Sequence, residues 1–189
     1  DLYGVSFDNN KGVILDNYAF RGTSGLNLQT MPCSILQSFN EYLNYKLIVL
    51  HYGPNVAANT TQNFDFYEKG MVKVIRHLQK CFPQASILVI GMGDKSYNNR
   101  GVYETQTNIP LLVQAQKNAA KKCNVAFWNL YEYMGGYNSM GVWVDSLKLA
   151  NKDYTHLNYK GTDKVARAMY SDIMFEFDEH KKNSKTVKK

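Results

Sequence analysis

The stretch Ser86-Ile87-Leu88-Val89-Ile90-Gly91 decides the fold class of this chain, because it is almost wholly apolar over the length of one strand. Residues 46–51, Lys-Leu-Ile-Val-Leu-His, have the same character, and residues 124–128 form a third, shorter run. Continuous apolar runs of this length are typical of strands that are covered on both faces of a parallel sheet. We therefore predict three buried strands at these positions.

Helical patterns alternate with these strands, at about 32–43, 63–80, 108–122 and 160–177. Alternation of this kind predicts an α/β sandwich around a mostly parallel, flavodoxin-like sheet with right-handed crossovers. The helix at 63–80 has an apolar stripe at helical spacing, formed by Phe64, Tyr67, Met71, Val74, Ile75 and Leu78. In the last helix, the residues expected to face inward are Val165, Ala166, Met169, Ile173 and Phe177.

The remaining segments are less regular. Residues 3–7 and 12–16 are short β-type runs around a turn, residues 92–107 form a long polar loop, and residues 129–149 are irregular with a helix near 141–149. We expect one domain at 1–178 and a basic, disordered tail at 179–189. The chain begins at Asp1, so we expect a processed or truncated product.

Composition excludes several classes of function. The net charge of +6 comes mostly from five lysines in the last nine residues, so the body is close to neutral and no nucleic-acid partner is expected. No apolar run approaches the roughly 20 residues of a membrane span. Cys33, Cys81 and Cys123 lack metal-ligand spacing and are expected as buried or free thiols, although Cys81 and Cys123 lie near helix ends and could pair.

The segment Asp153-Tyr154-Thr155-His156 holds an acid and a histidine three residues apart. A serine hydrolase needs such a pair, because the carboxylate fixes the imidazole tautomer and the free nitrogen then takes a proton from a nucleophile. The alternative is a capping and turn arrangement before the last helix.

Two further residues fall on the same edge of the predicted sheet, where the carboxyl ends of the strands meet. Gly25 offers a backbone N–H in a small-residue turn, and Asn55 offers a side-chain amide after the strand at 46–51. Two such donors aimed at one point would stabilise an oxyanion. The alternatives are a positive φ at Gly25 and a turn or cap at Asn55.

Together these motifs resemble the SGNH (GDSL) hydrolase family. Gly25 in Arg-Gly-Thr-Ser-Gly, Asn55 in Gly-Pro-Asn, and Asp153-x-x-His156 are similar to its second, third and last conserved blocks, in the family's order. The resemblance implies a three-layer α/β/α fold, a Ser–His–Asp mechanism with an acyl-enzyme, and no cofactor or metal. It is closest to bacterial members associated with cell-surface polysaccharide or peptidoglycan, in which a Gly-Gly-x-Asn-Ser-Met segment like 135–140 also occurs. This implies an acylated carbohydrate substrate and a periplasmic or extracellular location.

The first block of the family, Gly-Asp-Ser after the first strand, is absent from this sequence. Ser6 is a mid-strand serine, and Ser24 belongs to the glycine turn. We therefore expect the nucleophile to lie upstream of Asp1, in a segment that also supplies the missing first strand. Without it, strand edges are left unpaired.

Five other residues are weaker candidates for substrate binding: Arg21, His51, Asn138, Ser139 and Trp143. Each has a structural alternative, such as a surface ion pair for Arg21 or packing for His51 and Trp143. The sequence thus predicts an acylhydrolase that removes short acyl groups, acetyl among them, from carbohydrate. The rivals are a non-catalytic carbohydrate-binding or scaffolding relative, and a flavodoxin-like domain that binds a nucleotide or flavin.

Overall fold

The computed structural model describes residues 11–20, 22–57 and 61–186 of the chain. Along the sequence they form η1 (Leu26–Thr30), α1 (Cys33–Leu43), β1 (Leu47–His51), α2 (Asp65–Cys81), β2 (Ser86–Ile90), β3 (Ser96–Asn99), β4 (Val102–Thr105), α3 (Ile109–Lys122), β5 (Ala126–Trp128), α4 (Leu130–Met134), α5 (Ser139–Gly141), η2 (Val142–Ser146) and α6 (Tyr159–Thr186). The three predicted strands are confirmed as β1, β2 and β5, and the four predicted helices as α1, α2, α3 and α6.

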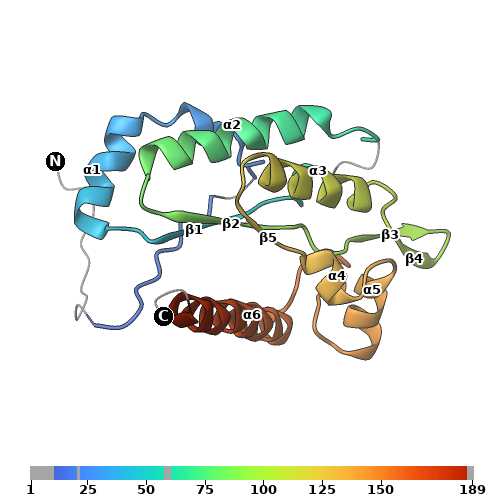
Figure 1. The fold of residues 1–189 in the computed structure, drawn as a ribbon. Helices are drawn as coiled ribbons and strands as arrows, with labels where there is room; N and C mark the ends of the chain where they lie inside the picture. Colours follow the sequence, from blue (N-terminus) through green and yellow to red (C-terminus); the bar gives the residue numbers. More distant parts are fainter. Residues whose placement is uncertain (1–10, 21, 58–60, 187–189) are drawn as a thin grey trace.

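The main sheet is parallel and has the order β1-β2-β5. Its register pairs Val49 with Leu88 and Ile90 with Trp128. Helices α1, α2 and α3 cover one face, and α6 lies on the other (Figure 1). The predicted three-layer α/β architecture is therefore confirmed.

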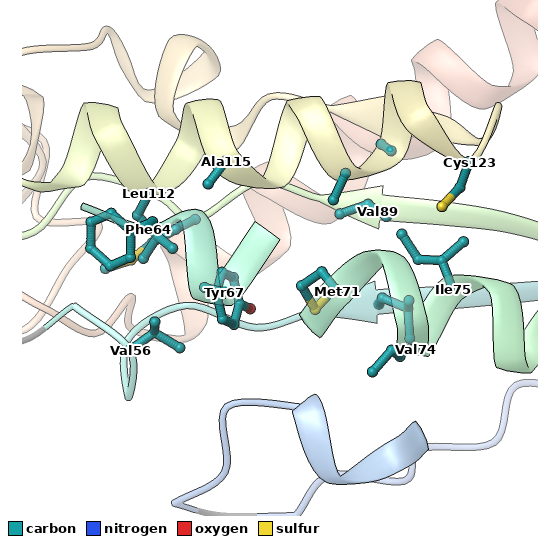
Figure 2. Close-up of a cluster of buried hydrophobic side chains, with 14 of the residues drawn as sticks. Val56, Phe64, Tyr67, Met71, Val74, Ile75, Val89, Leu112, Ala115 and Cys123 are labelled. Atoms are coloured by element: carbon teal, nitrogen blue, oxygen red, sulfur yellow. The ribbon is translucent and has the colours of Figure 1, made fainter. Parts of the chain in front are cut away.

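The central strand β2 buries both of its faces, as its continuous apolar run predicts. Ile87 and Val89 belong to the core beneath α2 and α3, whereas Leu88 and Ile90 face a second cluster on the opposite side. Figure 2 shows the first core, where α2 and α3 meet above the sheet. All of the predicted stripe of α2 is buried there: Phe64, Tyr67, Met71, Val74, Ile75 and Leu78. Burying a side chain of this size contributes about 1.5–3 kcal/mol.

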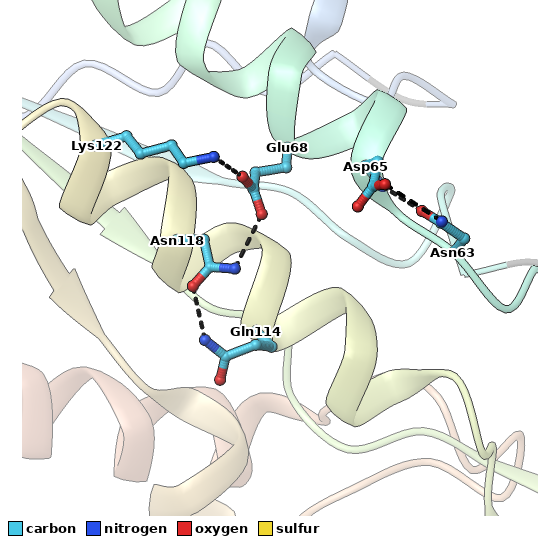
Figure 3. A network of polar contacts seen from close by, with 6 residues as sticks. All are labelled: Asn63, Asp65, Glu68, Gln114, Asn118 and Lys122. Carbon is cyan, nitrogen blue, oxygen red and sulfur yellow. Dashed lines mark hydrogen bonds and ion pairs between the residues drawn. The ribbon is translucent and has the colours of Figure 1, made fainter.

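A polar network joins the outer sides of α2 and α3 (Figure 3). Glu68 forms an ion pair with Lys122 and accepts a hydrogen bond of 2.9 Å from Asn118 Nδ2. These two bonds lower the pKa of Glu68. Oδ1 of Asn118 in turn accepts a hydrogen bond of 2.8 Å from Gln114 Nε2. A cleft of about 210 Å³ opens between the two helices here, and none of the predicted site residues lines it.

Strand β1 is covered on one face only. Leu50 is buried beneath α2, but Leu47 and Val49 on the other face remain 44% and 40% exposed. The expected strand at 12–16 is wrong: residues 11–20 contain no strand, and Val13 is 97% exposed. A strand needs a hydrogen-bonded neighbour, and β1 pairs only with β2 among the described residues. The expected strand at 3–7 lies outside the described residues.

Helix α6 differs from its prediction in length and in exposure. It continues to Thr186, so residues 179–186 are helical where we expected a disordered tail. Val165 and Met169 pack against the second cluster, but Ile173 and Phe177 are 39% and 46% exposed and Ala166 is also exposed. Its expected apolar face is thus covered only in its first half. Among the described residues, no helix combines the length and apolar character that crossing a membrane requires.

The expected loop at 92–107 contains an antiparallel hairpin, β3–β4, in which Asn99 pairs with Val102. Arg100 and Gly101 form its two-residue turn, both with positive φ (52° and 93°). This conformation is typical of the tight turns that match the twist of paired strands. Residues 129–149 are more helical than expected and contain α4, α5 and η2.

A disulfide bond joins Cys33 to Cys81, with their Cα atoms 5.2 Å apart. It ties the start of α1 to the end of α2. Cys123 is a buried free thiol whose burial raises its pKa. The expectation that all three cysteines are thiols is therefore wrong, and so is the alternative pairing of Cys81 with Cys123.

Candidate functional site

Asp153 and His156 form a hydrogen-bonded pair in the turn before α6. The distance from Asp153 Oδ2 to His156 Nδ1 is 2.8 Å. The other carboxylate oxygen, Oδ1, accepts hydrogen bonds from the backbone N–H groups of Thr155 (2.9 Å) and His156 (3.0 Å). One carboxylate oxygen thus stabilises the turn, and the other contacts the imidazole ring.

The electrostatics of the pair suit a general base. Burial alone would raise the pKa of Asp153, but the hydrogen bonds from the backbone and ring of His156 and from Thr155 together lower it. A carboxylate next to Nδ1 favours the tautomer that carries its proton on this nitrogen and has its lone pair on Nε2. The side chain of His156 is 67% exposed, and Nε2 has no partner within the described part of the chain.

Gly25 and Asn55 meet at Thr23. The backbone N–H of Gly25 donates to Thr23 Oγ1 (3.1 Å), and Asn55 Nδ2 donates to the carbonyl of Thr23 (3.3 Å). Two segments far apart in sequence therefore place their donors around one residue. Gly25 has a φ of 83°, and a Cβ here would lie 2.7 Å from the ring of Tyr52. Glycine is thus required by conformation and by close approach.

The sequence did not predict the role of Gln116, which joins the segments just after β1 and β2. Gln116, on α3, is 1% exposed. Its Oε1 accepts from the backbone N–H of Met92 (2.8 Å), and its Nε2 donates to the carbonyl of Tyr52 (2.7 Å). This amide joins the segments that follow β1 and β2. A polar residue in an apolar helical stripe was the available signal.

Tyr67 was predicted only as part of the α2 core stripe. It also binds the glycine turn, because its hydroxyl donates to the carbonyl of Ser24 over 3.3 Å. Burial raises the pKa of this phenol. The turn that holds Gly25 is therefore fixed from α2 as well as from Tyr52.

The weaker candidates for substrate binding differ in their exposure and contacts. His51 ends β1 and is exposed. Asn138 is exposed, but its backbone N–H donates to Thr105 Oγ1 (2.7 Å) and its Oδ1 accepts from the backbone N–H of Thr105 (2.9 Å). Ser139 is buried and donates to Asp94 (3.3 Å). Arg21 and Ser6 lie outside the described residues.

Trp143 cannot stack on a sugar in this structure. It is 2% exposed within the second core cluster, and its indole N–H donates to the carbonyl of Met134 (2.8 Å). The apolar ring is held in the core, and its one donor is satisfied there. The expectation of a substrate platform at this residue is therefore wrong.

No hydrogen bond joins the Asp153–His156 pair to the Gly25–Asn55 pair among the described residues. The pairs are local assemblies at the ends of different segments.

The sequence matches no family model, and no curated protein sequence matches it. Solved structures do match it in fold. A peptidoglycan O-acetylesterase has a TM-score of 0.71 and 25% identity, over 82% of this chain and 44% of that one. An acetyl xylan esterase has a TM-score of 0.54 and 20% identity, over 80% of this chain and 77% of that one.

The chain has an SGNH hydrolase-like fold. A third solved structure, a protein from Lactobacillus plantarum, has a TM-score of 0.54 and 15% identity, over 79% of this chain and 71% of that one. This SGNH hydrolase-like chain spans less than half the length of the O-acetylesterase.

Proposed function

We propose that this chain is the larger part of an SGNH-type serine esterase that removes short acyl groups, acetyl foremost, from carbohydrate. The observation that carries the proposal is the Asp153–His156 pair, with Nδ1 bound to the carboxylate and Nε2 exposed. Likeness to two solved esterases, one acting on peptidoglycan O-acetyl groups and one on acetyl xylan, supports it at the level of the fold.

His156 acts first as base and then as acid. Its Nε2 takes the proton of a serine hydroxyl as the serine oxygen attacks the ester carbonyl, and it then gives that proton to the leaving alcohol. Water hydrolyses the acyl-enzyme by the same two transfers. Asp153 keeps the ring oriented and stabilises the imidazolium.

Gly25 and Asn55 stabilise the tetrahedral oxyanion. Both donors bind Thr23 in this structure. The amide of Asn55 forms a long bond of 3.3 Å, so exchanging it for an anionic oxygen is favourable because charge-assisted bonds are shorter and about twice as strong. Removal of one such donor typically lowers kcat about 10²–10³-fold.

The nucleophilic serine comes from a segment outside these 189 residues, because the sequence has no Gly-Asp-Ser motif. Among the described residues, β1 pairs with a strand on one side only, and this supports the step. An added strand on its other side would extend the sheet next to the partly exposed Leu47 and Val49. The Cys33–Cys81 disulfide supports an oxidising periplasmic or extracellular location.

The test is hydrolysis of a small acetyl ester by this chain alone and by the chain joined to its native upstream segment. We expect activity only in the longer protein, loss of activity in His156→Ala, and one serine adduct with a phosphonate, located upstream by peptide mass. An adduct within residues 1–189 would refute the upstream serine. Inactivity of the longer protein, with acetylated polysaccharide still bound, would favour the non-catalytic carbohydrate-binding alternative.

A further inference from the structure

A buried carboxylate lies in the segment between β2 and β3. Asp94 is 2% exposed and accepts hydrogen bonds from Thr105 Oγ1 (2.7 Å), the backbone N–H of Met140 (2.7 Å) and Ser139 Oγ (3.3 Å), besides that of Lys95 (2.9 Å). A buried charge is costly unless donors surround it. Three of these donors come from β4 and α5, so Asp94 joins both elements to the segment that follows β2.

The β3–β4 hairpin and η2, the element directly after α5, hold Tyr154, the residue next to Asp153. Its carbonyl accepts from the backbone N–H of Ser96 on β3 (2.9 Å). Its ring stacks on Tyr103 of β4, with centroids 3.5 Å apart and planes within 4°. Its hydroxyl donates to Asp145 of η2, which follows α5 directly (2.9 Å). Three separate contacts thus hold one residue.

Tyr154 needs this support because of its backbone. Its φ is 51°, in the left-handed region that residues other than glycine rarely adopt. The turn that brings the Asp153 carboxylate to the His156 ring passes through this conformation. If the surrounding contacts were lost, the turn could relax and the pair would separate.

We propose that Asp94, Thr105 and Tyr103 are positioning residues, which hold Tyr154 and thereby keep the Asp153–His156 pair in its reactive geometry. This inference rests on the proposed function, because it assigns a role relative to the base. The β3–β4 hairpin then contributes to the reaction by holding Tyr154. Asp94, Thr105 and Tyr103 do not contact the Asp153–His156 pair directly. A misplacement of about 1 Å at a catalytic group can lower the rate about 10²-fold.

The test compares four variants of the protein that includes its upstream segment. Tyr103→Leu removes the stacking ring, whereas Tyr103→Phe keeps it. Thr105→Val removes a hydroxyl at nearly constant volume. Asn99→Ala is the matched control, because it removes an exposed hairpin bond to Glu104 (3.1 Å) that is not part of the support of Tyr154.

Two measurements are made on each variant: kcat and KM for a small acetyl ester, and the rate at which trypsin cuts the folded protein after the exposed Lys152. We expect Tyr103→Leu and Thr105→Val to lower kcat about tenfold or more with KM within about twofold. We expect the same variants to raise cleavage after Lys152 at least several-fold, since a loosened turn opens more often. Tyr103→Phe and Asn99→Ala should match the parent protein in the ester kinetics and in the rate of cleavage after Lys152.

The inference is overturned if Tyr103→Leu leaves cleavage after Lys152 unchanged, or if cleavage rises while kcat does not fall. Tyr103 is 37% exposed, so its variants test the idea even if Thr105→Val does not fold. Failure of the proposed function is recognised separately, by activity that survives His156→Ala. The cleavage rates do not depend on hydrolysis, and they still decide whether the hairpin holds the turn.

Discussion

Removing the Cys33–Cys81 disulfide should destabilise the chain substantially. The bond closes a loop with a sequence separation of 48 residues, which spans α1, β1 and α2. In the chain-entropy model a loop of this length contributes about 4 kcal/mol, through restriction of the unfolded state. Helix α1 has no fully buried residue, so the native contacts near the bond compensate little for its loss. For a chain of this size the loss corresponds to a fall in Tm of roughly 8–16 °C.

The first assay is a thiol titration in denaturant. We expect one reactive thiol, from Cys123, without reductant and three after reduction. Calorimetry then compares the double variant Cys33→Ser/Cys81→Ser with Cys123→Ala. Reductant should lower the Tm of Cys123→Ala but have no effect on the double variant. Three thiols before reduction, or a Tm that is insensitive to reductant in Cys123→Ala, would refute the reasoning.

Two further predictions concern Gln116 and Asp153. Gln116→Leu leaves the buried N–H of Met92 and the partly buried carbonyl of Tyr52 without this partner, so we expect it to lower the free energy of unfolding, measured in urea, by about 2–4 kcal/mol. Gln114→Leu, an exposed change on the same helix, should have a minor effect, and equal effects would contradict the assignment. Because hydrogen bonds lower the pKa of Asp153 in the folded state, its contribution to stability is complete above its unfolded pKa of about 3.9 and is lost only as pH falls through the lower folded value. A carboxyl-carbon NMR titration of Asp153 with a midpoint above the unfolded value would oppose this.

The sheet and its helices were predictable because their signals are local. Buried positions can be read directly from the sequence in three places: the apolar runs of β1 and β2 and the apolar stripe of α2. The geometry of Asp153 and His156 was predictable for the same reason, since three residues of turn bring the two groups together. The hairpin β3–β4 also had a local signal, the turn at Arg100-Gly101, which the polarity of its surroundings obscured.

The sequence predictions were wrong or incomplete where a residue's contacts come from a distant segment of the chain. The run at 12–16 has strand-like residues, but strand formation depends on a neighbour. The roles of Gln116 and Asp94, and the choice of Cys33 as the partner of Cys81, depend on how helices and strand ends meet in space. Trp143 was misjudged because an aromatic residue near a site has the same sequence signal whether it is buried or exposed.

The two carboxylate oxygens of Asp153 have different roles, and this affects which residues of the turn can change during evolution. Oδ1 supports the backbone and Oδ2 supports the ring. Under the proposed function, a descendant that had lost hydrolysis would still be under selection to keep the aspartate, because Oδ1 supports the backbone of the turn. The imidazole of His156 bonds only to Asp153 among the described residues, so drift could remove it at little cost to folding. Across related chains, the histidine is therefore the more informative marker of retained chemistry.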